Sequence, residues 1–264
     1  MMKTLFLFLI MTLFVGCKSK ESNMIKIVFL HHSTGQSIWY GKTNRYIRKL
    51  TNRSDVGAYF QNYNRKNRTN YKIENLIFPQ AASYGWKNYP FDYYNIWVKN
   101  AGEQTYMNEP TLELLTRDYD IVIFKHCYPV SNIDEDTGAP DIDSERKSLE
   151  NYILQYQALK TKMHEFSSTK FIVWTPAAQV KNNITTEEAQ RTKQFVDWIK
   201  NKWDEPGDNI FVWDFYQLET EGGLYMADRN AAGPSDSHPT VEFAARVAPL
   251  FAQFIIDVVE GIHE

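Results

Sequence analysis

The sequence predicts a three-layer α/β/α domain with a mostly parallel sheet, and three observations support this fold class. First, four short, continuous apolar runs each have the length of a strand that is buried on both faces. Second, longer segments with apolar residues every three to four positions lie between them and indicate amphipathic helices. Third, the 264 residues, of which 43% are hydrophobic, are enough for one large core. Strands that alternate with such helices are typical of a parallel sheet covered on both sides.

The predicted strands are the apolar runs themselves. The four clear runs read IKIVFL, DIVIFK, KFIVWT and NIFVWDF, at Ile25–Leu30, Asp120–Lys125, Lys170–Thr175 and Asn209–Phe215. A fifth and weaker candidate is KIENLIF, at Lys72–Phe78. The expected sheet therefore has four or five strands.

Three of the intervening segments are predicted to be long helices. Ser144–Glu165 carries a single apolar stripe. Thr185–Trp203 begins with an acidic first turn, which suits the positive end of a helix dipole. Val241–Val259 follows Thr240, a residue type that commonly caps a helix N-terminus. The segment 81–109 has poor periodicity and is rich in Tyr, Asn, Trp and Gly, so we predict an insertion that carries binding surface.

The chain begins with features of a secretion signal. A positive start, Met1-Met2-Lys3, precedes an apolar stretch, Leu5–Val15, that is shorter than the ~20 residues needed to span a bilayer. The following LFVGC resembles the lipobox of bacterial lipoproteins, which implies cleavage before Cys17 and acylation of its thiol. Residues 18–23 are then a tether and residues 24–264 the folded domain. The resemblance implies a lipid anchor in the bacterial cell envelope, on the periplasmic face or the cell surface; the alternative is a plain secretory signal.

Cysteine content and charge narrow the class of protein. Cys17 and Cys127 are the only cysteines, so a disulfide framework is excluded. The net charge of −3 and the pI of about 6.1 give no basic surface for nucleic acid. Aromatic residues make up 15% of the chain, and the surplus of Tyr and Trp suits a sugar ligand, although core packing explains it equally well.

Reactive side chains follow the predicted strands. His31, His32 and Ser33 come directly after the first strand, and His126 and Cys127 come after the strand at 120–125. Ligands of parallel α/β sheets bind beyond the carboxyl ends of the strands, so these side chains are candidates for one site. Serine becomes a nucleophile when a base takes its proton and a carboxylate orients that base. On its own, a serine at the position of Ser33 is more often a turn or helix N-cap residue than a nucleophile.

A possible base and acid stand together in PSDSHPT, residues 234–240, just before the last helix. The order of Ser33 first and Asp236-Ser237-His238 last resembles the SGNH (GDSL-type) hydrolases, in which D-x-x-H-P precedes the closing helix. This resemblance implies a flavodoxin-like fold and a serine esterase that needs no cofactor. It also implies that Ser33 is the nucleophile, His238 the base and Asp236 the acid.

The resemblance further implies an oxyanion hole and a substrate class. The oxyanion would be held by the amides of Ser33 and Gly85 and by the side chain of Asn132, each worth roughly 3–4 kcal/mol. We expect the substrate to be an acyl ester, most simply an acetyl ester, on a carbohydrate. The side chains expected to contact this substrate are His32, His126 and Trp86.

The sequence departs from the family pattern at several positions. His31-His32 stands where the family has Gly-Asp, and G-x-N-D is absent, so that His126 or Cys127 occupies the place of an oxyanion donor. The family's three-residue offset from the base falls on Ser235 rather than Asp236. Asp228, Asp214 or a backbone carbonyl are therefore alternative partners for His238.

Two other classes of function remain open from the residues alone. A zinc site would need His31, His32, His126, Cys127 and His238 to meet at one sheet edge, although no short H-x-x-x-H or C-x-x-C spacing is present. A non-catalytic surface lipoprotein would bind glycan through the aromatic residues of the segment 81–109.

Overall fold

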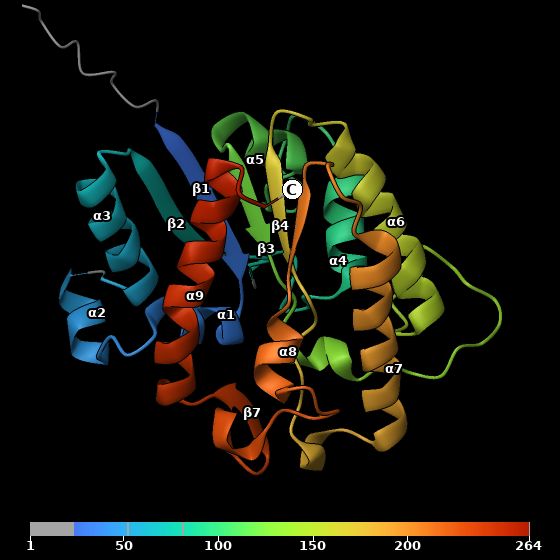
Figure 1. Ribbon diagram of the computed structural model, residues 1–264. Coiled ribbons are helices and arrows are strands. Elements are labelled where there is room, and N and C mark those ends of the chain that lie inside the picture. The colour runs from blue at the N-terminus through green and yellow to red at the C-terminus, as the bar shows by residue number, and fades with distance from the viewer. Residues whose placement is uncertain (1–23, 52, 81, 264) are drawn as a thin grey trace, which may run out of the picture.

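The computed structural model describes residues 24–263 apart from residues 52 and 81, and within them the sheet is parallel and five-stranded. Its strand order is β2-β1-β3-β4-β5, the order of flavodoxin-like domains (Figure 1). The strands are β1 (Ile25–His31), β2 (Tyr71–Ile77), β3 (Ile121–Phe124), β4 (Lys170–Trp174) and β5 (Ile210–Trp213). The predicted three-layer α/β/α fold and all five predicted strands are confirmed.

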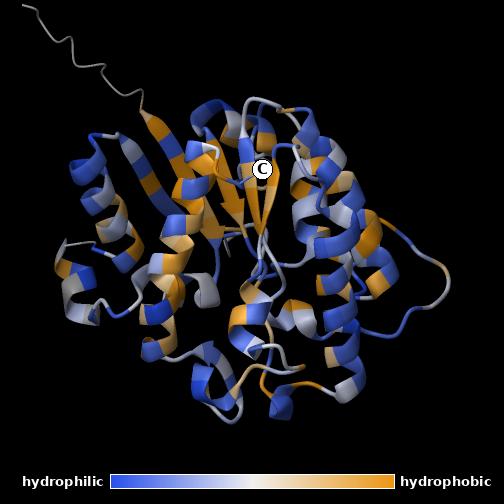
Figure 2. Cartoon of the chain, in the orientation of Figure 1, coloured by the Kyte–Doolittle hydropathy of each residue, from blue (hydrophilic) through white to orange (hydrophobic). Residues whose placement is uncertain are grey.

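The central strands are apolar throughout because both faces of the sheet are covered. In β1, Val28 and Leu30 face one core while Ile27 and Phe29 face the other, and all four are buried. Figure 2 shows the central strands as the most hydrophobic part of the chain. Strand β2 lies at the sheet edge and is mostly half-buried or exposed, which explains its weaker sequence signal.

One helical layer is formed by the beginning and the end of the chain (Figure 1). Helix α9 packs against α1 and α3, and α3 also covers β2. The helices of this half are α1 (Ser33–Tyr40), α2 (Arg45–Thr51), α3 (Asp55–Asn67), α8 (Phe215–Thr220) and α9 (Val241–Glu260). Their apolar residues bury the face of the sheet that carries Phe29 and Trp174.

The middle of the chain forms the other layer. Its helices are α4 (Pro90–Tyr94), α5 (Leu112–Asp118), α6 (Leu149–His164) and α7 (Thr186–Trp198), with π-helical turns at Asn95–Lys99 and Ile199–Trp203. The segment 81–109 thus contributes α4 and the first π-helical turn, and its Tyr93 and Trp97 are fully buried against the sheet. Some of the aromatic surplus is therefore core.

The predicted helix boundaries hold where a capping side chain is present. Thr185 forms a capping box with Glu188 at the start of α7, and Thr240 accepts a hydrogen bond from the Phe243 N–H at the start of α9. Helix α6 begins only at Leu149, because the five residues before it lie in a loop.

The sequence features at the N-terminus lie outside the part of the chain that the structure describes. Cys17, the signal and the tether therefore remain predictions. Among the described residues, no helix combines the length and the hydrophobicity needed to cross a bilayer.

Candidate functional site

The carboxyl edge of the sheet brings together three segments that are far apart in the sequence. Ser33 opens helix α1 directly after β1, and Cys127 lies just beyond β3. A short hairpin of β6 (Ala231–Gly233) and β7 (Asp236–Pro239) packs against α1 and carries the predicted base (Figure 1). The strands point toward this end of the molecule, as the topology rule for parallel sheets requires.

Asp236 and His238 form a hydrogen-bonded pair. His238 Nδ1 lies 2.6 Å from Asp236 Oδ1, and the His238 backbone N–H donates to the same oxygen at 3.0 Å. These two hydrogen bonds lower the pKa of the Asp236 carboxyl. Residues two apart on a strand share one face, so the two-residue offset suits a pair held by β7. Asp214, an alternative acid, instead caps α8 and pairs with Lys200.

The pairing through Nδ1 orients His238 as a general base requires. Its Nε2 makes no hydrogen bond to any residue that the structure describes, and the edge of its ring meets Tyr128 with centroids 5.2 Å apart. Nε2 is the atom that takes the serine proton in a Ser-His-Asp triad.

Ser33 is exposed, and its hydroxyl is directed at a thiol. Ser33 Oγ lies 3.3 Å from Cys127 Sγ, and no hydrogen bond joins it to His238 in the described part of the chain. Helix α1 and strand β7 are in contact, so Ser33 and His238 belong to neighbouring elements. Catalytic hydrogen bonds are often long or misaligned in a free enzyme and tighten only when substrate binds.

A small pocket of about 160 Å³ opens beside Ser33. It is lined by His32, Ser33, Trp86, Asn88, Tyr89, Cys127 and Pro129. Two of the three predicted substrate contacts are thus in the pocket wall. His32 Nε2 is bonded to the Pro79 carbonyl at 2.8 Å, and the ring of exposed Trp86 meets His32 edge-on at 5.2 Å. A larger cavity of about 660 Å³ lies at the opposite edge of the sheet and contains neither Ser33 nor His238.

Three predicted site residues are placed elsewhere. His126 is buried, with Nδ1 bonded to the Asn88 carbonyl and Nε2 to the Tyr156 hydroxyl, so its ring belongs to the core. The Asn132 side-chain amide donates to the Asn183 carbonyl, and its Oδ1 accepts from the Gln179 side-chain amide. Gly85 has a φ of 112° next to Trp86, but it does not line the pocket. The proposed reaction therefore does not involve His126 or Asn132.

His31, at the end of β1, supports α1 from below. It is buried, with Nδ1 bonded to the His32 carbonyl at 2.9 Å and Nε2 to the Asn75 amide at 3.0 Å. Burial lowers the pKa of His31 to about 3, so the ring is neutral at physiological pH. Helix α1 approaches His31 closely at Gly35, where a Cβ would lie only 2.5 Å from the His31 Cβ.

Asn88 is a pocket-wall residue that sequence reasoning missed. It is buried in the pocket wall, and its Oδ1 accepts from the Cys127 backbone N–H. Its amide donates to the Phe78 carbonyl at 2.8 Å and to the Tyr93 hydroxyl at 3.1 Å. Asn88 therefore ties the ends of β2 and β3 to the segment that carries Trp86. No sequence signal distinguishes it from the other asparagines of that segment.

Glu109 holds the same segment from its other side. Its Oε1 accepts from the Gln80 backbone N–H, while Oε2 is buried without a hydrogen-bond partner among the described residues. Burial raises the pKa of Glu109 from 4.5 to about 7, although the Gln80 N–H opposes the shift.

We predict a pH-dependent stability from Glu109. Between about pH 4.5 and pH 7 the folded state holds a proton that the unfolded chain has lost, so the free energy of unfolding falls as pH rises through this window. Glu109→Gln keeps the acceptor for Gln80 and removes the ionisation. The free energy of unfolding is measured with denaturant at pH 4.5 and pH 8. Between these two pH values, the stability of the variant relative to the native protein is expected to rise by about 2 kcal/mol. An equal difference at both pH values would contradict this assignment.

The histidines do not converge on a metal site. The ring nitrogens of His31 and His126 are bonded to protein groups, and His238 Nδ1 is bonded to Asp236. Within the described ranges, no three His, Cys, Asp or Glu side chains are grouped so that they could hold a metal ion.

Comparison with known proteins gives remote structural likeness only. No family model and no curated protein matches the sequence. The fold is similar to that of a gut microbial diltiazem-metabolizing enzyme, at 12% identity and a TM-score of 0.49, over 88% of this chain and 47% of that one. It is also similar to a carbohydrate esterase with divergent catalytic and non-catalytic binding functions, at 12% identity and a TM-score of 0.39, over 88% and 65% of the two chains. The chain thus spans less than two thirds of the length of either protein.

Proposed function

We propose that this protein is a serine esterase of the SGNH type. The observation that carries the proposal is the Asp236–His238 pair, held through Nδ1 on an element that packs against the helix opened by Ser33. The arrangement supplies an exposed hydroxyl, a base whose Nε2 has no partner among the described residues, and an acid that fixes the tautomer of that base. The same order of residues along the chain is what resembles the SGNH hydrolases.

The reaction begins with a rotation of the Ser33 side chain. Its Oγ turns from Cys127 Sγ, 3.3 Å away, toward His238 Nε2. His238 then takes the hydroxyl proton while Oγ attacks the ester carbonyl, and Asp236 stabilises the imidazolium that forms. Collapse of the tetrahedral intermediate releases the alcohol with the proton from His238. Water, activated by the same imidazole, hydrolyses the acyl-enzyme and restores Ser33.

The oxyanion has one backbone donor in the wall of the pocket, the Ser33 N–H at the first position of α1. The first N–H groups of a helix have no partner inside the helix and lie at the positive end of its dipole. The Gly85 N–H, one residue before Trp86 of the pocket wall, is the proposed second donor.

The size of the pocket supports a small acyl group. About 160 Å³ suits an acetyl group and its carbonyl rather than a long chain. Trp86 is 68% exposed at the rim and presents an aromatic face of the kind that binds sugar rings. We therefore propose acetyl esters of carbohydrates as substrates, and anchoring to the bacterial envelope through Cys17.

The proposal is tested with a fluorophosphonate, which reacts with serines activated by a base. The Ser33 oxygen displaces fluoride from phosphorus, and the mass of the adduct is mapped to a tryptic peptide. We expect one adduct at Ser33, and loss of p-nitrophenyl acetate hydrolysis in step with labelling. His238→Ala is expected to abolish labelling while leaving Ser33 in place. A protein that hydrolyses no acetyl ester, takes no label and yet binds glycan would be the non-catalytic alternative.

A further inference from the structure

Cys127 faces the same pocket as Ser33, and the proposed reaction does not use it. Its Sγ lies 3.3 Å from Ser33 Oγ and 3.9 Å from Thr34 Oγ1, and its backbone N–H is held by Asn88. Two hydroxyls directed at one sulfur stabilise the thiolate form. The thiol is also part of the pocket wall, so a small molecule that reaches Ser33 also reaches Cys127.

Lys125, two residues before Cys127, is a buried basic side chain that interacts electrostatically with this thiol. Lys125 is fully buried, and its Nζ has no hydrogen-bond partner among the residues described. Its side chain passes beneath the first turn of α1, since a Cβ on Gly35 would lie 3.0 Å from Lys125 Cδ. An unpaired buried ammonium is costly unless an anion lies close to it.

Two acidic groups interact with Lys125, the Cys127 thiol and the Glu219 carboxyl. Glu219 is fully buried and accepts from the Ala178 N–H, and burial raises the pKa of its carboxyl well above the usual range, which favours its neutral form. Of the two groups, the Cys127 sulfur has two hydroxyls within hydrogen-bond distance that favour its negative form. Burial alone would raise the pKa of Cys127, but Lys125 and the hydroxyls of Ser33 and Thr34 outweigh it and the pKa is lowered. Burial lowers the pKa of Lys125 itself, an effect that a neighbouring thiolate opposes.

We infer that Cys127 is a covalent modification site for small, uncharged thiol-reactive electrophiles, and that its modification blocks the Ser33 pocket. The pocket volume limits the reagent to a few heavy atoms, and the aromatic and proline walls favour an uncharged one. The blocking part of the inference rests on the proposed esterase function, whereas the reactivity of the thiol does not.

The reaction is a thiol exchange with methyl methanethiosulfonate as the probe. The Cys127 sulfur attacks the methylthio sulfur, an S–S bond forms, and the bond to the sulfonyl sulfur breaks. Methanesulfinate leaves with the electron pair, and the thiol proton passes to solvent. The product carries an S-methylthio group on the sulfur that lies 3.3 Å from Ser33 Oγ, and it no longer has a thiolate for the hydroxyl to contact. Dithiothreitol reverses the exchange.

The experiment measures labelling of the full chain at pH 6, where an ordinary thiol is almost entirely protonated. The Cys127 adduct is quantified in its tryptic peptide, which separates it from Cys17, and glutathione in the same tube is the reference thiol. We expect Cys127 to react at least threefold faster than glutathione. Lys125→Met is expected to slow this reaction about tenfold, the effect of one pKa unit on the thiolate fraction. Labelling no faster than glutathione would overturn the inference, whether or not Lys125→Met folds.

Blocking is measured on the same samples as the ratio of treated to untreated p-nitrophenyl acetate hydrolysis. We expect this ratio to fall in step with labelling, to recover with dithiothreitol, and to stay near one in Cys127→Ala. Full labelling with an unchanged rate would overturn the blocking role. Ser33→Ala is expected to be labelled at Cys127 while it has no esterase activity, so a failure of the proposed function is distinguished from a failure of this inference.

Discussion

Ser33→Ala and His238→Ala are each expected to lower kcat/KM for p-nitrophenyl acetate by about 10⁴-fold, and the double variant is expected to lose no more than either one. The reason is that the two side chains perform one step, transfer of the Ser33 proton to His238 Nε2, so that removing either abolishes it. Asp236 acts through His238, because its Oδ1 lies 2.6 Å from His238 Nδ1. Asp236→Asn is therefore expected to lower kcat/KM by less, about 10²- to 10³-fold.

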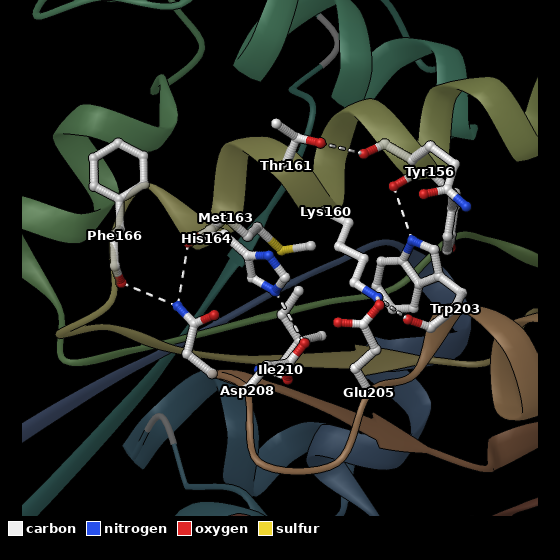
Figure 3. A network of polar contacts seen from close by, with 12 residues as sticks. Tyr156, Lys160, Thr161, Met163, His164, Phe166, Trp203, Glu205, Asp208 and Ile210 are labelled. Atoms are coloured by element: carbon white, nitrogen blue, oxygen red, sulfur yellow. Dashed lines mark hydrogen bonds and ion pairs between the residues drawn. The ribbon is translucent and has the colours of Figure 1, made fainter.

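The molecule contains a matched control for this prediction. His164 Nε2 lies 2.9 Å from Asp208 Oδ2 in a second His–Asp pair (Figure 3). The two residues precede β4 and β5, whereas Ser33 follows β1, so the pair lies at the other end of the parallel strands. Ion pairs near the surface contribute about 1 kcal/mol or less to stability, so His164→Ala is expected to remain folded. Its kcat/KM is therefore expected to stay within about twofold of the native value. Losses that multiply in the Ser33 and His238 double variant would show that the two residues act separately, and would contradict the triad.

Gly35→Ala is expected to lower the free energy of unfolding by about 1–3 kcal/mol and kcat/KM by about 10- to 100-fold. The added Cβ would lie 2.5 Å from the His31 Cβ and 3.0 Å from Lys125 Cδ. His31 ends the fully buried stretch of β1 and cannot move without disturbing the sheet, so α1 must move instead. Ser33 is the first residue of that helix, and a shift of its Oγ by a fraction of an ångström misaligns the attack.

Gln36→Ala is the control, because Gln36 is the exposed neighbour of Gly35 on the same helix. It introduces the same residue type without a contact beneath the helix, so both stability and kcat/KM are expected to stay near the native values. Stability is measured by chemical denaturation and activity with p-nitrophenyl acetate. A Gly35→Ala protein as active as Gln36→Ala would mean that the position of α1 does not set the reactivity of Ser33.

The fold could be predicted because its signals are local. Runs such as Ile25–Leu30 are apolar at every position since both faces of the sheet are covered, and strands of this kind are recognised without knowledge of their neighbours. The helix start at Thr240 was predicted from a capping residue and that at Thr185 from an acidic first turn, and the structure has a capping side chain at both. The start of α6 was wrong by five residues, because polar residues from Ser144 to Ser148 continue the helical pattern without joining the helix.

The candidate site could be predicted in part. The sequence placed Ser33 and His238 at one sheet edge through the topology rule, and it named Asp236 as the acid despite the unusual offset. The structure accounts for that offset, since Asp236 and His238 lie on one face of β7. It also moves His126 into the core and shows Asn132 engaged with Asn183 and Gln179.

The sequence by itself determined the sheet, the helix caps and the identity of the reactive side chains, because these depend on periodicity and on residue chemistry. Only the tertiary structure decided which of those side chains meet. Cys127 faces Ser33, and Gly35 allows α1 to approach His31 and Lys125, across separations of up to 94 residues. Such contacts depend on how strands and helices pack, and the residues involved have no periodic pattern or short motif that would connect them.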